Sequence, residues 1–162
     1  MATTTIKNDP ATLAAAHLAY SDAITAIRSG KIGDVGWTIV FQPLLPEWTR
    51  KGDPNPLGLA KLGDEALVII NFTVSWADRK DDDFIKSTTR NAVEQIDSYA
   101  NAHGTGNRYR YLNYCAEWQR SFEEYGEENW RLLREASSKY DPEGLFQKGC
   151  VGGFKLDVVD GF

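Results

Sequence analysis

The sequence predicts an α+β fold in which helices pack on one face of a small antiparallel sheet, while the other face forms a pocket or a dimer interface. Two segments repeat apolar residues with the 3.6-residue period of amphipathic helices, and two others alternate apolar and polar residues as strands do. The elements run helix, strand, long loop, strand, helix, strand, helix, an order typical of a two-layer domain. Residues 1–162 are expected to form that single domain.

The first helix is expected to begin at Asp9-Pro10, because Asp caps helix N-termini and Pro is favoured at the first helical position. Ser29-Gly30 ends it. Residues 1–9 are polar and rich in Thr, and we expect them to be flexible, as we do residues 157–162 at the other end of the sequence.

Two strands follow the first helix. Residues 35–43 have a two-residue period that puts Trp37 and Phe41 on one side. Residues 66–76 form a second such segment, apolar on its even-numbered side and increasingly polar on its odd-numbered side. The intervening residues 44–63 are rich in Pro and Gly and predict a long loop, a kind of segment that is often functional.

The C-terminal half predicts a helix, a short strand and another helix. The acidic residues 81–83 favour a helix N-terminus, because negative charge there interacts well with the helix dipole. Residues 108–114 are predicted to form the short strand. The last helix is expected to start at the capping box formed by Ser121 and Glu124, or nearer to Gly126.

Composition excludes several classes of protein. A net charge of -5 argues against electrostatic binding of nucleic acid or anionic lipid. Neither a secretory signal nor an apolar run of about 18 residues is present, so we expect a cytoplasmic protein with no membrane or nucleic-acid partner. The four residues Cys115, Cys150, His17 and His103 have no metal-ligand spacing, and no metal is expected.

Motifs for nucleotide binding or hydrolysis are weak. Gly104-Thr105-Gly106 follows a predicted helix rather than a strand and lacks the third Gly of the dinucleotide fingerprint. The chain has no P-loop, no G-x-S-x-G and no H-E-x-x-H. His103 is interpreted as a residue that interacts with a helix C-terminus rather than as a general base.

The second side of the predicted sheet is more informative. It carries eight residues with amide, hydroxyl or phenol groups: Thr38, Gln42, Asn71, Thr73, Ser75, Tyr109, Tyr111 and Asn113. Polar groups opposite a helix-packed face usually face solvent. Here they are interleaved with Val40, Leu67 and Ile69, and such a mixture is more typical of a small-molecule site.

Several spaced motifs also occur in the order found in one known family. They are Phe41-Gln42-Pro43-Leu44, Asn55-x-Leu57-Gly58-Leu59, Ser75-Trp76-x-Asp78, Tyr111-Leu112-Asn113-Tyr114, Tyr125-Gly126-Glu127-Glu128-Asn129 and Lys139-Tyr140-Asp141-Pro142. With these motifs, residues 10–156 resemble the C-terminal half of fungal berberine-bridge-enzyme-like FAD-linked oxidases. The resemblance implies a substrate domain without the FAD-binding domain, so we expect no cofactor.

The resemblance also suggests roles for individual residues. Asn71 matches the position of a Glu or Gln that faces flavin and substrate in the family, although an amide cannot take up a proton at neutral pH. Tyr111 and Asn113 match the family's Y-x-N motif in the active site. We therefore predict Asn71, Tyr111 and Asn113 as catalytic residues. The predicted substrate-binding residues are Thr38, Gln42, Thr73, Ser75 and Tyr109.

These observations predict a cofactor-independent enzyme of fungal secondary metabolism. It would cyclise (pericyclic cycloaddition included), isomerise or dehydrate a polyketide-type, largely apolar substrate. The alternative is a non-catalytic or split subunit that completes a separate FAD-binding oxidase chain; a binding protein without activity is a third possibility. An uncovered sheet face favours association, so we expect a homodimer.

Overall fold

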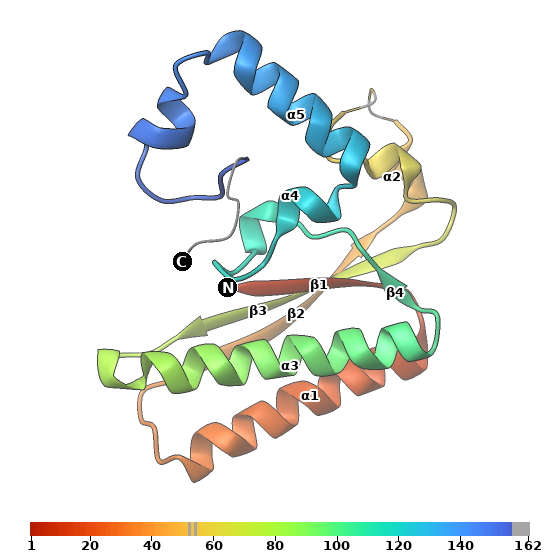
Figure 1. The fold of residues 1–162 in the computed structure, drawn as a ribbon. Coiled ribbons are helices and arrows are strands. Elements are labelled where there is room, and N and C mark those ends of the chain that lie inside the picture. The colour runs from red at the N-terminus through yellow and green to blue at the C-terminus, as the bar shows by residue number, and fades with distance from the viewer. Residues whose placement is uncertain (52, 54, 157–162) are drawn as a thin grey trace.

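The centre of the fold is one antiparallel sheet with the strand order β2-β3-β1-β4. Its strands are β1 (Ala2–Lys7), β2 (Gly36–Leu44), β3 (Leu67–Ser75) and β4 (Gly106–Asn107). A computed structural model describes residues 1–51, 53 and 55–156. Helices α1 (Pro10–Ser29) and α3 (Asp82–Ala102) lie side by side on one face of the sheet (Figure 1). The predicted α+β class is confirmed.

The core lies between this first face of the sheet and the two helices. Val68, Ile70 and Phe72, on the even-numbered side of β3, are at most 5% exposed. The ring of Phe72 meets that of Trp37 on β2 edge to face, with centroids 5.8 Å apart. Helix α1 begins as expected, because the Asp9 side chain accepts a hydrogen bond from the backbone N–H of Thr12 at 2.8 Å.

The expectation that residues 1–9 are flexible is wrong. Residues 2–7 form β1, which lies inside the sheet between β3 and β4, and its three consecutive threonines are fully buried. Thr is β-branched and favours strands, and the Thr3 hydroxyl donates to the Ile70 carbonyl oxygen at 2.8 Å. The matching expectation for residues 157–162 lies outside the described residues.

The predicted strand at residues 108–114 is also wrong. Strand β4 contains only Gly106–Asn107, and a short 3-10 helix, η3 (Leu112–Tyr114), follows. The Tyr109 backbone N–H donates to the Asn107 side chain at 2.9 Å, and Arg110 donates to the Asn107 carbonyl oxygen at 2.8 Å. Side chains therefore take the place of the hydrogen bonds that a longer strand would make.

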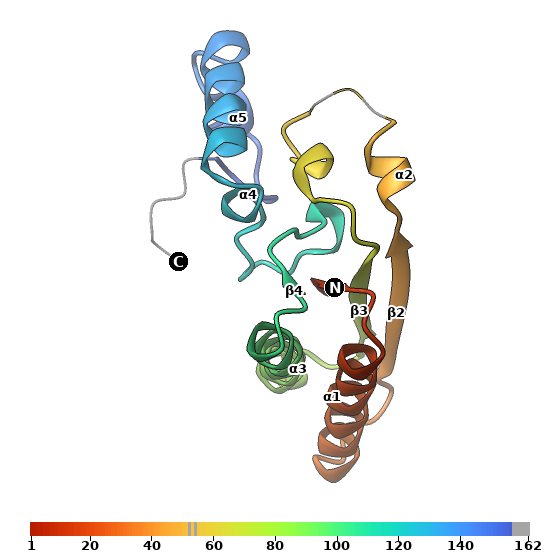
Figure 2. The same cartoon turned by 90° about the vertical axis from the view of Figure 1, so that its right-hand side faces the viewer.

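The remaining helices are short or lie apart from α1 and α3. The long loop contains α2 (Pro46–Thr49) and η1 (Leu59–Lys61), and η2 (Arg79–Asp81) precedes α3. Further along are α4 (Ser121–Glu124), α5 (Glu127–Tyr140) and the π-helical turn η4 (Leu145–Gly149). Figures 1 and 2 show α5 far from α1 and α3.

The structure has two helices, α4 and α5, where the sequence predicted a single helix with two alternative starting points. Arg120, not Ser121, is the N-cap of α4, so the predicted capping box does not form. Gly126 separates α4 from α5 with a φ of 91°, a conformation that a residue with a Cβ rarely adopts. No helix within the described ranges is both long and apolar enough to span a membrane.

Candidate functional site

The face of the sheet opposite α1 and α3, here called the second face, carries the predicted polar side chains of β2 and β3. The register pairs Thr38 with Thr73, Val40 with Asn71 and Gln42 with Ile69, so these side chains share one face as the alternation predicted. Ser75, at the end of the same row, pairs with Gly36. Thr38, Gln42, Thr73 and Ser75 are exposed, whereas Asn71 is only 5% exposed.

Asn71 is the most constrained polar group of the second face. Its Nδ2 donates to the Thr73 hydroxyl oxygen at 3.0 Å. Its Oδ1 is buried and accepts no hydrogen bond from the described residues. A buried acceptor without a donor is uncommon in folded proteins because it is costly. The Asn71 Oδ1 is therefore an unsatisfied acceptor, and a ligand with a hydrogen-bond donor would reach it only if the side chains that bury it moved.

The loop after β4 provides the aromatic part of the site. Asn113 Nδ2 donates to the Tyr111 hydroxyl oxygen at 2.9 Å, so the predicted Tyr and Asn lie together. The rings of Tyr111 and Tyr114 meet edge to face with centroids 4.8 Å apart. The Tyr114 hydroxyl donates to Gln42 Oε1 at 3.3 Å and connects this loop to β2. Tyr114 was not among the predicted site residues, although the i, i+3 spacing of the two tyrosines fits a 3-10 turn.

Tyr109 is brought near Tyr111 but is buried, whereas the predicted polar residues of β2 and of the end of β3 are exposed. It is 3% exposed and lies in an apolar cluster with Ile69 and Tyr125, against which Tyr111 and Tyr114 pack. Its ring stacks on that of Tyr125 with centroids 5.8 Å apart. Burial raises the pKa of the Tyr109 phenol, which makes it a poor proton donor at neutral pH.

Two hollows lie beside the second face rather than on it. One, of about 430 Å³, lies between the long loop, β4 and α4; the other, of about 240 Å³, lies between β3, α3 and residues 115–118. Neither is lined by Asn71, Tyr111 or Asn113. These three predicted catalytic residues therefore lie outside both hollows.

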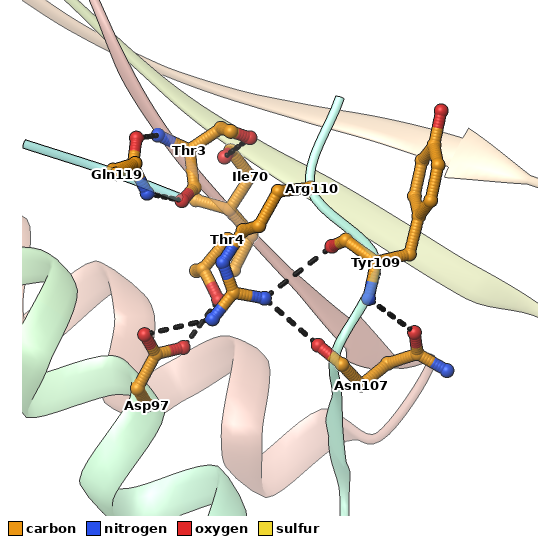
Figure 3. Close-up of polar contacts among 8 residues, drawn as sticks. All are labelled: Thr3, Thr4, Ile70, Asp97, Asn107, Tyr109, Arg110 and Gln119. Atoms are coloured by element: carbon orange, nitrogen blue, oxygen red, sulfur yellow. Dashed lines mark hydrogen bonds and ion pairs between the residues drawn. The ribbon is translucent and has the colours of Figure 1, made fainter. Parts of the chain in front are cut away.

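Figure 3 shows how the loop that carries the aromatic residues is fixed to the sheet and to α3. Arg110 Nη2 forms an ion pair with Asp97 Oδ2 at 2.9 Å, and the Thr4 hydroxyl donates to the same carboxylate. The Gln119 side chain accepts from the Thr3 backbone N–H at 3.0 Å and donates to the Thr3 carbonyl oxygen at 2.7 Å. These contacts position Tyr111 and Asn113 from both ends of their segment.

Other reactive side chains in the region are inactive or unclustered. Burial raises the pKa of the Cys115 thiol to about 11, so it is a thiol rather than a nucleophilic thiolate at neutral pH. Over the described ranges, no three His, Cys, Asp or Glu side chains are grouped so that they could hold a metal ion.

Comparisons with known proteins identify relatives but no family model and no solved structure that matches. The chain is 37% identical over 121 residues to the FAD-dependent monooxygenase sdcF of Emericella nidulans, covering 73% of this chain and 25% of that protein. It is 30% identical over 162 residues to the FAD-dependent monooxygenase drtC of Aspergillus calidoustus, covering 97% of this chain and 30% of that protein. A bifunctional solanapyrone synthase of Alternaria solani is 28% identical over 107 residues, covering 66% of this chain and 20% of that protein.

The chain thus spans only 25% of the length of sdcF and 30% of the length of drtC. The narrower resemblance to berberine-bridge-enzyme-like oxidases stays a prediction. The sequence similarity shows that the chain is homologous to a segment of fungal proteins named FAD-dependent monooxygenases.

Proposed function

We propose that the second face is the substrate-facing wall of an enzyme of fungal secondary metabolism, and that it binds a polyketide-type intermediate for cyclisation, isomerisation or dehydration. The observation that carries this proposal is the unpaired, buried Oδ1 of Asn71 on the second face, to which the loop with the paired Tyr111 and Asn113 is joined by the Tyr114–Gln42 hydrogen bond. A buried acceptor and a phenol donor beside apolar and aromatic residues match a ligand with a hydroxyl and a carbonyl group.

In this proposal Tyr111 acts on the substrate carbonyl. Asn113 donates to the Tyr111 oxygen, and the Tyr111 hydroxyl proton is bonded to no described residue, so it is free to point towards a ligand. A donor fixed in this way stabilises the negative charge that develops on a carbonyl oxygen during enolisation or ring closure. When the side chains that bury Asn71 move aside, its Oδ1 accepts from a substrate hydroxyl, and both contacts keep a flexible intermediate in one folded conformation.

A second candidate is that the chain completes a flavin site, and the names of its relatives favour it. The described residues fit only part of FAD. Asn71 Oδ1 and the Tyr111–Asn113 pair could hydrogen-bond a heterocyclic ring. The glycines at 104 and 106 follow the C-terminus of α3, so they do not offer a helix N-terminus to phosphates. Bound FAD would supply electron transfer, and a separate segment or chain would hold its phosphates.

Turnover by two variants tests the wall itself. We expect Tyr111→Phe to lower turnover about 100-fold, because it removes one donor to the developing oxyanion. Asn71→Ala should lower turnover about tenfold, because it removes one hydrogen bond to the substrate. Turnover is measured by mass spectrometry as consumption of a metabolite that accumulates when the gene is deleted. Wild-type rates in both variants would exclude this site.

Matched controls and added flavin distinguish the two candidates. Tyr140→Phe and Asn91→Ala alter exposed residues on α5 and α3, and both should keep the wild-type rate. Turnover by the purified chain without flavin supports the first candidate. Turnover that requires both FAD and a flavin-binding partner chain supports the second, and product formation by neither preparation contradicts both.

A second copy of the chain is our proposed cover for the wall when the chain is purified alone. Val40, on the second face, is 40% exposed, and exposed apolar side chains favour association. We therefore expect a dimer in analytical ultracentrifugation at micromolar concentration, and Val40→Lys should shift it to the monomer. A monomer in the unaltered chain at that concentration would contradict this expectation.

A further inference from the structure

The hollow of about 430 Å³ has a lining that the proposed function does not use. It lies where the long loop, β4 and α4 meet, and its volume is within the range of about 300–1,000 Å³ that is common for small-molecule sites. Apart from Tyr109, none of the predicted site residues lines it. Its walls are apolar and aromatic on one side, with Leu57, Leu62 and the stacked rings of Tyr109 and Tyr125.

Two opposite charges line this hollow without pairing. Arg108 makes no hydrogen bond or ion pair with another described residue, and the same holds for the carboxyl group of Glu124. They do not pair with each other. Neighbouring charges behave differently, since Lys61 pairs with Glu128, and Arg110 pairs with Asp97. The guanidinium group of Arg108 and the carboxyl group of Glu124 are therefore available to a ligand that has a partner for each of them.

The backbone makes room for the free cation. A Cβ added at Gly126 would lie only 2.8 Å from Arg108 Nη2 and 3.1 Å from its Cζ, so the guanidinium group rests against this glycine. Gly126 has a φ of 91°, which also favours glycine there. A side chain at position 126 would therefore displace the exposed Arg108 guanidinium group from its place beside the hollow.

We propose that this hollow binds a small aromatic carboxylic acid that carries a hydroxyl group. The ligand carboxylate pairs with the guanidinium of Arg108, whose planar donors match a carboxylate. The ligand hydroxyl meets Glu124, and the ring lies against the tyrosine and leucine side chains.

The state of Glu124 favours a hydroxyl over an ammonium group. Glu124 is half-buried, and burial raises the pKa of its carboxyl group, while Arg110 and Arg108 lower it and Asp97 and Glu123 raise it. A hydroxyl both donates and accepts, so it matches this carboxyl in either protonation state. An ammonium group would match only the ionised carboxylate. This difference separates a hydroxy acid from an amino acid as the ligand.

Calorimetric titration of the purified chain tests this proposal with three probes that differ by one group each: 4-hydroxybenzoate, benzoate and benzamide. We expect 4-hydroxybenzoate to bind most tightly, and benzamide to bind about 10- to 100-fold more weakly than benzoate because it lacks the charge. These comparisons need no variant. Undetectable binding of 4-hydroxybenzoate, or equal affinity for benzoate and benzamide, would overturn the proposal.

Two variants assign the contacts to their residues. Arg108→Gln should weaken both carboxylates about 10- to 100-fold, whereas Glu124→Met should remove only the preference for 4-hydroxybenzoate over benzoate. Arg131→Gln and Glu135→Met, which alter an exposed pair on α5, serve as controls and should leave every affinity unchanged. Tighter binding of L-phenylalanine than of 4-hydroxybenzoate would overturn the assignment to a hydroxy acid. Unchanged affinities in Arg108→Gln would overturn the assigned carboxylate contact.

Discussion

Replacing Gln119 by leucine lowers the free energy of unfolding by about 3–5 kcal/mol in our expectation, because two buried backbone groups and one half-buried one lose their partner. Gln119 is 7% exposed. Its Oε1 accepts from the Thr3 backbone N–H and its Nε2 donates to the Thr3 carbonyl oxygen (Figure 3). Its Oε1 also accepts from the backbone N–H of Ala116. Leucine has a similar volume but offers no hydrogen bond. Since small domains have a total stability of about 5–15 kcal/mol, this is a large effect.

Urea denaturation followed by circular dichroism measures the loss. Gln95→Leu on the exposed side of α3 is the matched control and should change stability by less than about 0.5 kcal/mol. Hydrogen exchange gives a local measurement, because the amides of Thr3 and Ala116 should exchange faster in Gln119→Leu. If both variants have the same urea midpoint, the three hydrogen bonds contribute nothing measurable.

Replacing Arg110 by methionine should cost about 2–4 kcal/mol, because it leaves the Asp97 carboxylate partly buried without its cation. The side chains of Arg110 and Asp97 are 11% and 29% exposed, so solvent screens this pair only in part. Arg110 also donates to the carbonyl oxygens of Asn107 and Tyr109, which lose a partner too. The segment that carries Tyr111 should therefore loosen as well as lose stability.

A second substitution separates the charge from the packing. Asp97→Asn in the Arg110→Met background removes the unpaired charge and should recover part of the stability measured by urea denaturation. Arg131→Met breaks an exposed pair with Glu135 on α5 and should cost no more than about 1 kcal/mol. Equal losses in Arg110→Met and Arg131→Met would show that burial of the Arg110 pair has no energetic consequence.

The elements that the sequence predicted well are those with one apolar and one polar side. On β3 the even-numbered side chains Val68, Ile70 and Phe72 face the helices, and this period is visible in the sequence. Strand β1 has no such period, because its consecutive threonines are buried whichever way they point. The interior position of β1 depends on β3 and Gln119, which are distant in sequence, so no local pattern indicates it.

In the candidate site, too, features with a local sequence period could be predicted and contacts between distant segments could not. The shared face of Asn71 and Thr73 results from strand alternation and could be predicted. The bond between Tyr114 and Gln42 joins two segments 72 residues apart, and local periodicity does not reveal such a contact. The hollow beside Arg108 and Glu124 could not be predicted, because three segments build it and the absence of an ion pair there is a property of the tertiary structure.

The interior position of β1 also bears on how the chain reaches its fold during synthesis. Thr3 bonds to Ile70, 67 residues later, and to Gln119, 116 residues later. A nascent polypeptide that has been synthesised beyond β3 but not yet as far as Gln119 contains β1 and its partner β3 but lacks the side chain that bonds to the other edge of β1. Pairing over such sequence distances is slow and leaves strand edges open to wrong association. A chaperone that shields this segment on the ribosome would therefore raise the yield of native protein.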